Sequence, residues 1–103
     1  MIPTQKNVMT YMIDPWNKIC LLKGPAEYQI LKEKAYGKYV SLIPFTPKVS
    51  KVTLEGFQYP LQDAEMTMGN SLGVSNEIVG EKAKILFEEG YLLVIESNDV
   101  PVV

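Results

Sequence analysis

Two neighbouring segments in the middle of the chain carry the side chains that are best suited to holding a small molecule. Residues 54–61 place aromatic rings beside a glycine and a proline, and residues 68–77 place small and short polar residues around the apolar Leu72 and Val74. Glycine lets a ligand approach the backbone closely, and the side chains of Ser75 and Asn76 both donate and accept hydrogen bonds. These residue types predict a binding surface, although serine and asparagine are also common in plain turns.

The rest of the sequence offers few groups for catalysis. It contains no histidine, which removes the usual general base near neutral pH and the commonest metal ligand. The single cysteine, Cys20, has no such base to activate it, so we expect a free, buried thiol in a reducing compartment. Glu88 and Glu89 are expected at a solvated turn, and Asp63 and Glu65 at the surface. We therefore expect neither a complete catalytic site nor a metal site in this chain.

The charged residues also limit the partners. All ten basic residues are lysine, and the formal net charge is -2. Arginine supplies the bidentate contacts used most often to read guanine and to bind phosphate, so its absence argues against nucleic acid. No stretch approaches the roughly 20 apolar residues of a membrane span, and the N-terminus lacks a secretory signal. We expect a cytoplasmic protein with no membrane partner.

The apolar residues recur mostly with a period of two, which is the period of strands rather than helices. Several short strands between turn signals are typical of an antiparallel β-sandwich or a jelly-roll-like barrel. We therefore predict an all-β fold with little or no helix. Residues 27–32 also fit a helical stripe, but a pairing partner directly upstream favours a strand. The expected strands are residues 18–23, 27–32, 39–43, 49–55, 65–68, 83–87 and 91–95.

Two turn signals predict two hairpins. Gly24-Pro25 would join the first two strands, and Glu88-Glu89-Gly90 would join the last two. The last strand is apolar on both faces, which predicts either a central strand or a face that another domain or subunit covers.

The chain length fits one domain with one core. Residues 1–14 are less regularly patterned and contain Pro3, so we expect a linker remnant or an added edge strand around Val8 to Ile13. Residues 15–103 are expected to form the β-sandwich domain.

The two binding segments also resemble a known family. Residues 54–61 read Leu-Glu-Gly-Phe-Gln-Tyr-Pro-Leu, and residues 68–77 read Met-Gly-Asn-Ser-Leu-Gly-Val-Ser-Asn-Glu. Residues 87–99 read Phe-Glu-Glu-Gly-Tyr-Leu-Leu-Val-Ile-Glu-Ser-Asn-Asp. Together with residues 17–22 and 39–45, their order and spacing resemble the C-terminal thiamine-binding domain of bacterial thiamine pyrophosphokinase (thiamine diphosphokinase).

The resemblance implies transfer of a pyrophosphoryl group from ATP to the hydroxyl group of thiamine, giving thiamine diphosphate and AMP. In that family, an N-terminal α/β domain holds ATP and Mg²⁺, and the C-terminal β-sandwich supports a homodimer. Thiamine lies between the β domain of one subunit and the catalytic domain of the other. The resemblance therefore implies ATP and Mg²⁺ outside this chain, thiamine as ligand, a catalytic domain and a second copy as partners, and no turnover by the chain alone.

The resemblance also implies site residues within the two segments. Ser75 and Asn76 occupy the family's Ser-Asn motif, and Tyr59 occupies the aromatic position after the glycine of the Leu-x-Gly motif. Tyr59 would stack on a ring of thiamine, and Asn76 would pair with the edge of the pyrimidine. Some relatives have serine in place of Gly73. The implied thiamine site consists of Tyr59, Ser71, Gly73, Ser75 and Asn76.

A second interpretation belongs to another class of protein. The lack of catalytic residues and the doubly apolar last strand also fit a non-enzymatic β module for dimerisation or small-molecule binding. Dimerisation without a response to thiamine would favour it.

Overall fold

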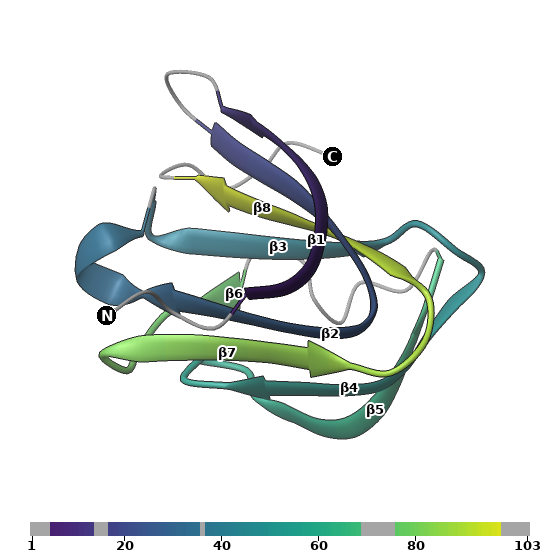
Figure 1. Ribbon diagram of the computed structural model, residues 1–103. Helices are drawn as coiled ribbons and strands as arrows, with labels where there is room; N and C mark the ends of the chain where they lie inside the picture. The colour runs from purple at the N-terminus through teal and green to yellow at the C-terminus, as the bar shows by residue number, and fades with distance from the viewer. Residues whose placement is uncertain (1–4, 14–16, 36, 69–75, 98–103) are drawn as a thin grey trace.

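The computed structural model in Figure 1 describes residues 5–13, 17–35, 37–68 and 76–97. Within these ranges, the chain forms one eight-stranded antiparallel sheet and a single turn of 3-10 helix, η1. The all-β prediction is therefore confirmed. The elements are β1 (Gln5–Ile13), β2 (Asn17–Leu31), η1 (Lys32–Lys34), β3 (Tyr39–Pro44), β4 (Lys48–Glu55), β5 (Leu61–Thr67), β6 (Asn76–Glu77), β7 (Lys82–Phe87) and β8 (Tyr91–Ser97).

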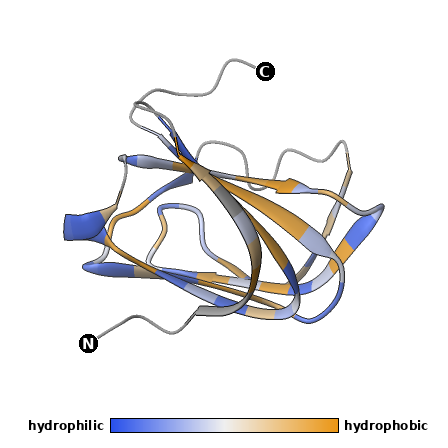
Figure 2. Cartoon of the chain, turned by 45° about the horizontal axis from the view of Figure 1, so that its top comes forward, coloured by the Kyte–Doolittle hydropathy of each residue, from blue (hydrophilic) through white to orange (hydrophobic). Residues whose placement is uncertain are grey.

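The strands are hydrogen-bonded in the order β5-β4-β7-β2-β8-β3-β6, with β1 added to β2 outside this path. The sheet curls over, so that the two halves of its concave face lie opposite each other around one core (Figure 1). Apolar and polar stretches alternate along its strands (Figure 2), as expected for a sheet with one face buried. Strands β2, β4, β7 and β8 bury alternate residues over much of their length, and the inward side chains form a single apolar core. Its largest fully buried side chains include Tyr28, Leu22, Leu42, Leu54, Met66, Ile85 and Leu92.

The first predicted hairpin is wrong, because the residues on both sides of Gly24 belong to one long bent strand, β2. The first part of β2, Asn17 to Lys23, pairs with β8, and the second part, Ala26 to Leu31, pairs with β7. Strand β1 pairs with both parts. The two arms therefore exchange no ladder hydrogen bonds with each other, as the arms of a hairpin would.

The second predicted hairpin is also wrong, because β7 and β8 each pair with β2 and lie on either side of it. Strands β7 and β8 both run antiparallel to β2, one after the other, and are turned by the same bend (Figure 1). At the bend, Gly24 and Pro25 of β2 lie opposite Glu88, Glu89 and Gly90. Two residues of β2 thus face three residues between β7 and β8. The extra residue makes a β-bulge, which bends a strand and shifts its alternation of inward and outward side chains by one residue. The alternating buried residues accordingly change from odd numbers in β7 to the even numbers 92, 94 and 96 in β8, where Ser97 at the end is buried as well.

Glycine makes this shared bend possible because the two chains approach each other closely. The amide of Gly24 donates a hydrogen bond to the carbonyl oxygen of Gly90 at 2.9 Å. A Cβ atom on Gly24 would lie 2.6 Å from the carbonyl oxygen of Glu88. Gly90 itself has a φ of 104°, which side chains disfavour. The turn residues recognised in the sequence therefore bend a sheet instead of ending a strand.

Strand β8 lies between β2 and β3 in the sheet, so the predicted central position is confirmed. Its inward residues Leu92 and Val94 are fully buried, whereas Leu93 and Ile95 on the outer face are partly exposed. The outer face of β3 continues this apolar surface with Ile43, which is 36% exposed. In the part of the chain that the structure describes, no helix has the length and apolar character needed to cross a membrane.

Candidate functional site

The chain after β4 lies against β6 and the residues that follow it, at the place where the curled sheet closes on itself. The amides of Val79 and Gly80 donate to the carbonyl oxygen of Gly56 at 2.9 and 3.2 Å, and the amide of Gln58 donates to the carbonyl oxygen of Glu77 at 2.8 Å. Phe57 and Ile78 form an antiparallel bridge between these bonds. We call residues 56–59 and 76–80 together the seam. It joins the two segments from which the sequence predicted a ligand surface.

Gly56 begins the seam in a conformation that other residues rarely adopt. Its φ is 79°, in the left-handed region that favours glycine. A Cβ atom at this position would clash with the carbonyl oxygen of Lys82 and lie 3.0 Å from Cα of Ala83. The glycine of the Leu-x-Gly motif is therefore required by close packing of the seam on β7.

Asn76 continues the seam with its side chain. Its Oδ1 accepts hydrogen bonds from the amides of Tyr59 and Glu77, both at 3.0 Å, and its Nδ2 donates to the carbonyl oxygen of Tyr59 at 2.9 Å. The side chain is only 1% exposed. The carboxamide thus acts like the main chain of a neighbouring strand, because it binds both the amide and the carbonyl group of Tyr59.

The side chain of Tyr59, in contrast, is 60% exposed. Along the chain, Tyr59 lies two residues after the buried bridge residue Phe57, which is 3% exposed, and directly before Pro60. An open surface depression of about 560 Å³ lies next to Tyr59 along the chain. It is lined by Pro60 and by residues of β4 and β5, including Leu61. Tyr59 therefore has a backbone held by the seam and a ring that faces solvent, which is the arrangement needed for stacking on a ligand.

The structure thus brings two of the five predicted site residues together, Tyr59 and Asn76. The other three, Ser71, Gly73 and Ser75, lie outside the described residues, and their assignment stays a prediction. The pairing of Asn76 with a pyrimidine edge also stays a prediction, although both lone pairs of its Oδ1 are occupied within the protein.

An interior polar group lies in the same cross-strand row as Asn76, and sequence reasoning gave it no role. Glu96 in β8 is paired with Val40 in β3, and Val40 is paired with Asn76 in β6. Directly paired residues point to the same face of a sheet, and these three are at most 2% exposed. The sequence signal was available, because Glu96 continues the inward alternation of Leu92 and Val94.

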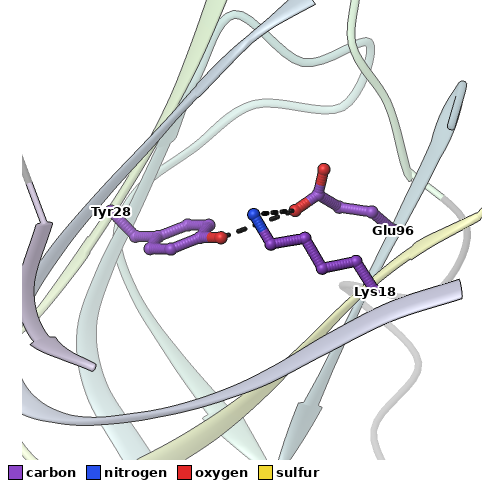
Figure 3. Close-up of polar contacts among 3 residues, drawn as sticks. All are labelled: Lys18, Tyr28 and Glu96. Atoms are coloured by element: carbon purple, nitrogen blue, oxygen red, sulfur yellow. Dashed lines mark hydrogen bonds and ion pairs between the residues drawn. The ribbon is translucent and has the colours of Figure 1, made fainter. Parts of the chain in front are cut away.

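The carboxylate of Glu96 is held by groups from β2 (Figure 3). Its Oε2 accepts a hydrogen bond from the hydroxyl group of Tyr28 at 3.5 Å and lies 4.0 Å from Nζ of Lys18. Tyr28 is only 1% exposed, and a buried carboxylate requires such partners to offset its loss of hydration. Tyr28 and Lys18 therefore hold Glu96 at one end of the cross-strand row whose other end is Asn76.

Cys20 is buried and free, as predicted. Burial raises the pKa of its thiol from 9.0 to about 11, although a hydrogen bond with Tyr28 lowers it in part. A thiol with such a pKa remains protonated near neutral pH and is a poor nucleophile.

The exposed charges beside the seam are few and of opposite sign. Nζ of Lys38 lies 3.8 Å from Oε1 of Glu77 and 5.6 Å from the centre of the Tyr39 ring. Such an exposed pair contributes about 0–1 kcal/mol. Within the described residues, no group of three or more His, Cys, Asp or Glu side chains is placed to hold a metal ion. The seam is suited to holding a ligand by stacking on Tyr59.

The sequence is similar to a known protein family and to a curated protein. The family described as "Thiamin pyrophosphokinase, vitamin B1 binding domain" matches residues 27–92, which include both Tyr59 and Asn76. Thiamine pyrophosphokinase of Bacillus subtilis (strain 168) is 37% identical over 93 residues. This alignment covers 90% of the present chain and 42% of the Bacillus protein.

Solved structures agree with this relationship. The crystal structure of thiamine pyrophosphokinase from Bacillus subtilis has a TM-score of 0.79 at 37% identity, covering 86% of this chain and 41% of that one. The thiamin pyrophosphokinase structure from Geobacillus thermodenitrificans has a TM-score of 0.78 at 32% identity, with coverages of 90% and 42%. The thiamin pyrophosphokinase of Candida albicans, at 20% identity and a TM-score of 0.65, shares the fold over 85% of this chain and 33% of its own.

The chain thus spans about two fifths of the length of these bacterial relatives. Its family match extends over more than half of its own residues and includes β3 to β7 in full. This match shows that the chain belongs to the vitamin B1 binding domain family of thiamin pyrophosphokinases.

Proposed function

We propose that this chain provides the thiamine-binding wall of a thiamine pyrophosphokinase. The main support is the family match over residues 27–92, which includes the whole seam. The exposed ring of Tyr59 on a backbone held by Asn76 gives this proposal a physical basis. Ser71, Gly73 and Ser75 complete the proposed site.

Stacking and weak polar contacts suit the chemistry of thiamine. The thiazolium ring is a cation and the aminopyrimidine is a flat aromatic ring, so either can lie against Tyr59. A cation–π contact contributes about 0.5–2 kcal/mol, depending on how far it is desolvated. A wall without arginine does not repel the cation as a strongly basic surface would.

The reaction itself is assigned to a second domain. In the proposed enzyme, ATP gives its pyrophosphoryl group to the hydroxyl group of thiamine, and AMP leaves. Phosphoryl transfer depends mainly on positioning and on charge neutralisation by metal ions and cationic groups. We assign ATP and Mg²⁺ to an N-terminal catalytic domain outside this chain. The seam has the task of holding thiamine in place. The chain alone is then inactive, and the complete enzyme works as a cytoplasmic homodimer.

A binding experiment tests the first part of the proposal. The 103-residue chain is titrated with thiamine and, as a control, with choline, a cation without an aromatic ring. We expect weak, saturable binding of thiamine, because half of the proposed pocket belongs to another domain. Choline should show no comparable binding. Equal responses to both ligands would contradict a thiamine site.

An activity experiment tests the second part. The chain replaces the corresponding part of Bacillus subtilis thiamine pyrophosphokinase, and AMP formation is measured with thiamine present and absent. We expect thiamine-dependent AMP formation that the isolated chain does not show. A folded chimera that hydrolyses ATP but never responds to thiamine would contradict the proposal.

A second candidate function is a dimerisation module, which the apolar outer surface of β3 and β8 favours. Ile43 is 36% exposed and Phe45 is 60% exposed on this side of the sheet. Sedimentation equilibrium of the chain with and without thiamine separates the two functions. A dimer together with no thiamine binding in the titration would favour the module.

A further inference from the structure

We propose that Asn76 is a positioning residue, which acts on the ligand through Tyr59 rather than by touching it. This inference rests on the proposed thiamine site and specifies the part played by one of its residues. The carboxamide of Asn76 fixes the main chain of Tyr59 and thereby the direction in which the exposed ring leaves the seam.

The hydrogen bonds of Asn76 support this role. An asparagine carboxamide has two lone pairs and two N–H groups. Both lone pairs are used within the seam, by the amides of Tyr59 and Glu77, and one N–H group binds the carbonyl oxygen of Tyr59. The oxygen that would accept a hydrogen bond from a ligand is therefore already saturated.

Burial leads to the same conclusion. Asn76 is 1% exposed and points inward in the row that contains Val40 and Glu96. Tyr59, in contrast, is 60% exposed. Contact with a ligand on the outer surface is thus available to Tyr59, whereas Asn76 lies beneath it.

The seam would not fix Tyr59 without this side chain. The ladder of main-chain hydrogen bonds reaches Gln58, whose amide donates to Glu77, and at Tyr59 the partner becomes the Asn76 side chain. Because Pro60 follows and has no amide hydrogen, it cannot add a rung of its own as a donor. Asn76 therefore extends the ordered backbone by the one residue that carries the stacking ring.

Amide hydrogen exchange of the 103-residue chain tests the clamp without any ligand. In N76A, we expect the Tyr59 amide to exchange about tenfold faster relative to the Gln58 amide, because the substitution removes the acceptor of the Tyr59 amide and leaves the main-chain acceptor of the Gln58 amide in place. N76D keeps the size and the acceptor but loses the donor, and serves if N76A does not fold; it should give a smaller acceleration. Q58A is the control and should leave the Tyr59 amide unchanged. Unchanged relative exchange in the folded Asn76 variants would overturn the clamp.

A double-mutant cycle on thiamine affinity tests whether Asn76 acts through Tyr59. We expect N76A to weaken thiamine binding about fivefold to tenfold, and to add less than twofold when Tyr59 is already alanine. Equal weakening in both backgrounds would overturn the positioning role and indicate direct contact. If Y59A leaves thiamine affinity unchanged, or the chain does not bind thiamine, the proposed function fails at this site, and the exchange result still decides the clamp.

Discussion

The hydroxyl group of Tyr28 donates a hydrogen bond to Oε2 of Glu96 at 3.5 Å, and both residues are at most 2% exposed. Tyr28 comes from the second arm of β2, whereas Glu96 lies in β8, which pairs with the first arm. The bond therefore crosses the core between the two halves of the bent sheet.

We predict that Y28F destabilises the protein by about 1–2 kcal/mol, because it removes a hydrogen-bond donor from a buried carboxylate. Chemical denaturation followed by circular dichroism measures the change. Y39F is the matched control, since Tyr39 is only partly buried, and should change stability by less than about 0.5 kcal/mol. Equal stability of Y28F and the unchanged protein would show that the bond has no net value.

Cys20 gives the protein a pH dependence in the alkaline range. Its pKa is raised to about 11 in the folded state from 9.0, so the folded protein holds this proton more tightly than the unfolded chain. Its contribution is complete below pH 9 and is lost as the pH rises through 11, amounting to about 2–3 kcal/mol at most. We predict that C20A lacks this component when the free energy of unfolding is compared at pH 8 and pH 10.5. Parallel pH profiles of the two proteins would contradict the assignment.

We predict that G56A destabilises the protein by more than about 3 kcal/mol. Alanine at this position meets both an unfavourable φ of 79° and a clash with the main chain of Lys82. G80A is the matched control in the same seam, because its Cβ would lie 3.3 Å from the same carbonyl oxygen. Thermal unfolding of both variants measures the difference. A G56A variant as stable as G80A would show that the seam can adjust at this position.

The ring of Tyr59 should matter for thiamine more than its hydroxyl group does. We predict that Y59A weakens thiamine binding about 2-fold to 30-fold, which corresponds to about 0.5–2 kcal/mol of ring contact, while Y59F changes it little. F45A is a suitable control, since Phe45 is an exposed aromatic residue with the same 60% exposure, on β3's connection to β4. Calorimetric titration measures all three variants. A loss in F45A as large as that in Y59A would point to a different surface.

The sequence predicted the strands better than their connections. Period-two alternation identified β4, whereas β3, β7 and β8 were identified as runs of apolar, β-branched and aromatic residues between turn signals. In β2, the alternation stays in phase through Gly24, from Leu22 to Ala26, so a bent strand and a hairpin give the same pattern. Only the pairing of the two parts of β2 with β7 and β8 distinguishes them, and this depends on residues more than 50 positions away.

The candidate site was predicted in part for a similar reason. Glycine, aromatic and Ser-Asn residues marked the two segments that meet at the seam. Local sequence does not reveal that the Asn76 side chain would take the place of a strand opposite Tyr59. Glu96 was overlooked because a glutamate near the end of a strand is usually solvated, whereas here it continues the buried face.

Mapping thiamine on the chain by NMR tests the central claim most directly. Backbone amide resonances of the 103-residue chain are followed while thiamine is added. We predict concentration-dependent shifts at Gln58, Tyr59 and Glu77 in the seam, and none at Glu88 to Gly90 in the bend, which serves as the internal reference. Shifts centred away from the seam, or no shifts at millimolar thiamine, would contradict the claim that this surface holds thiamine.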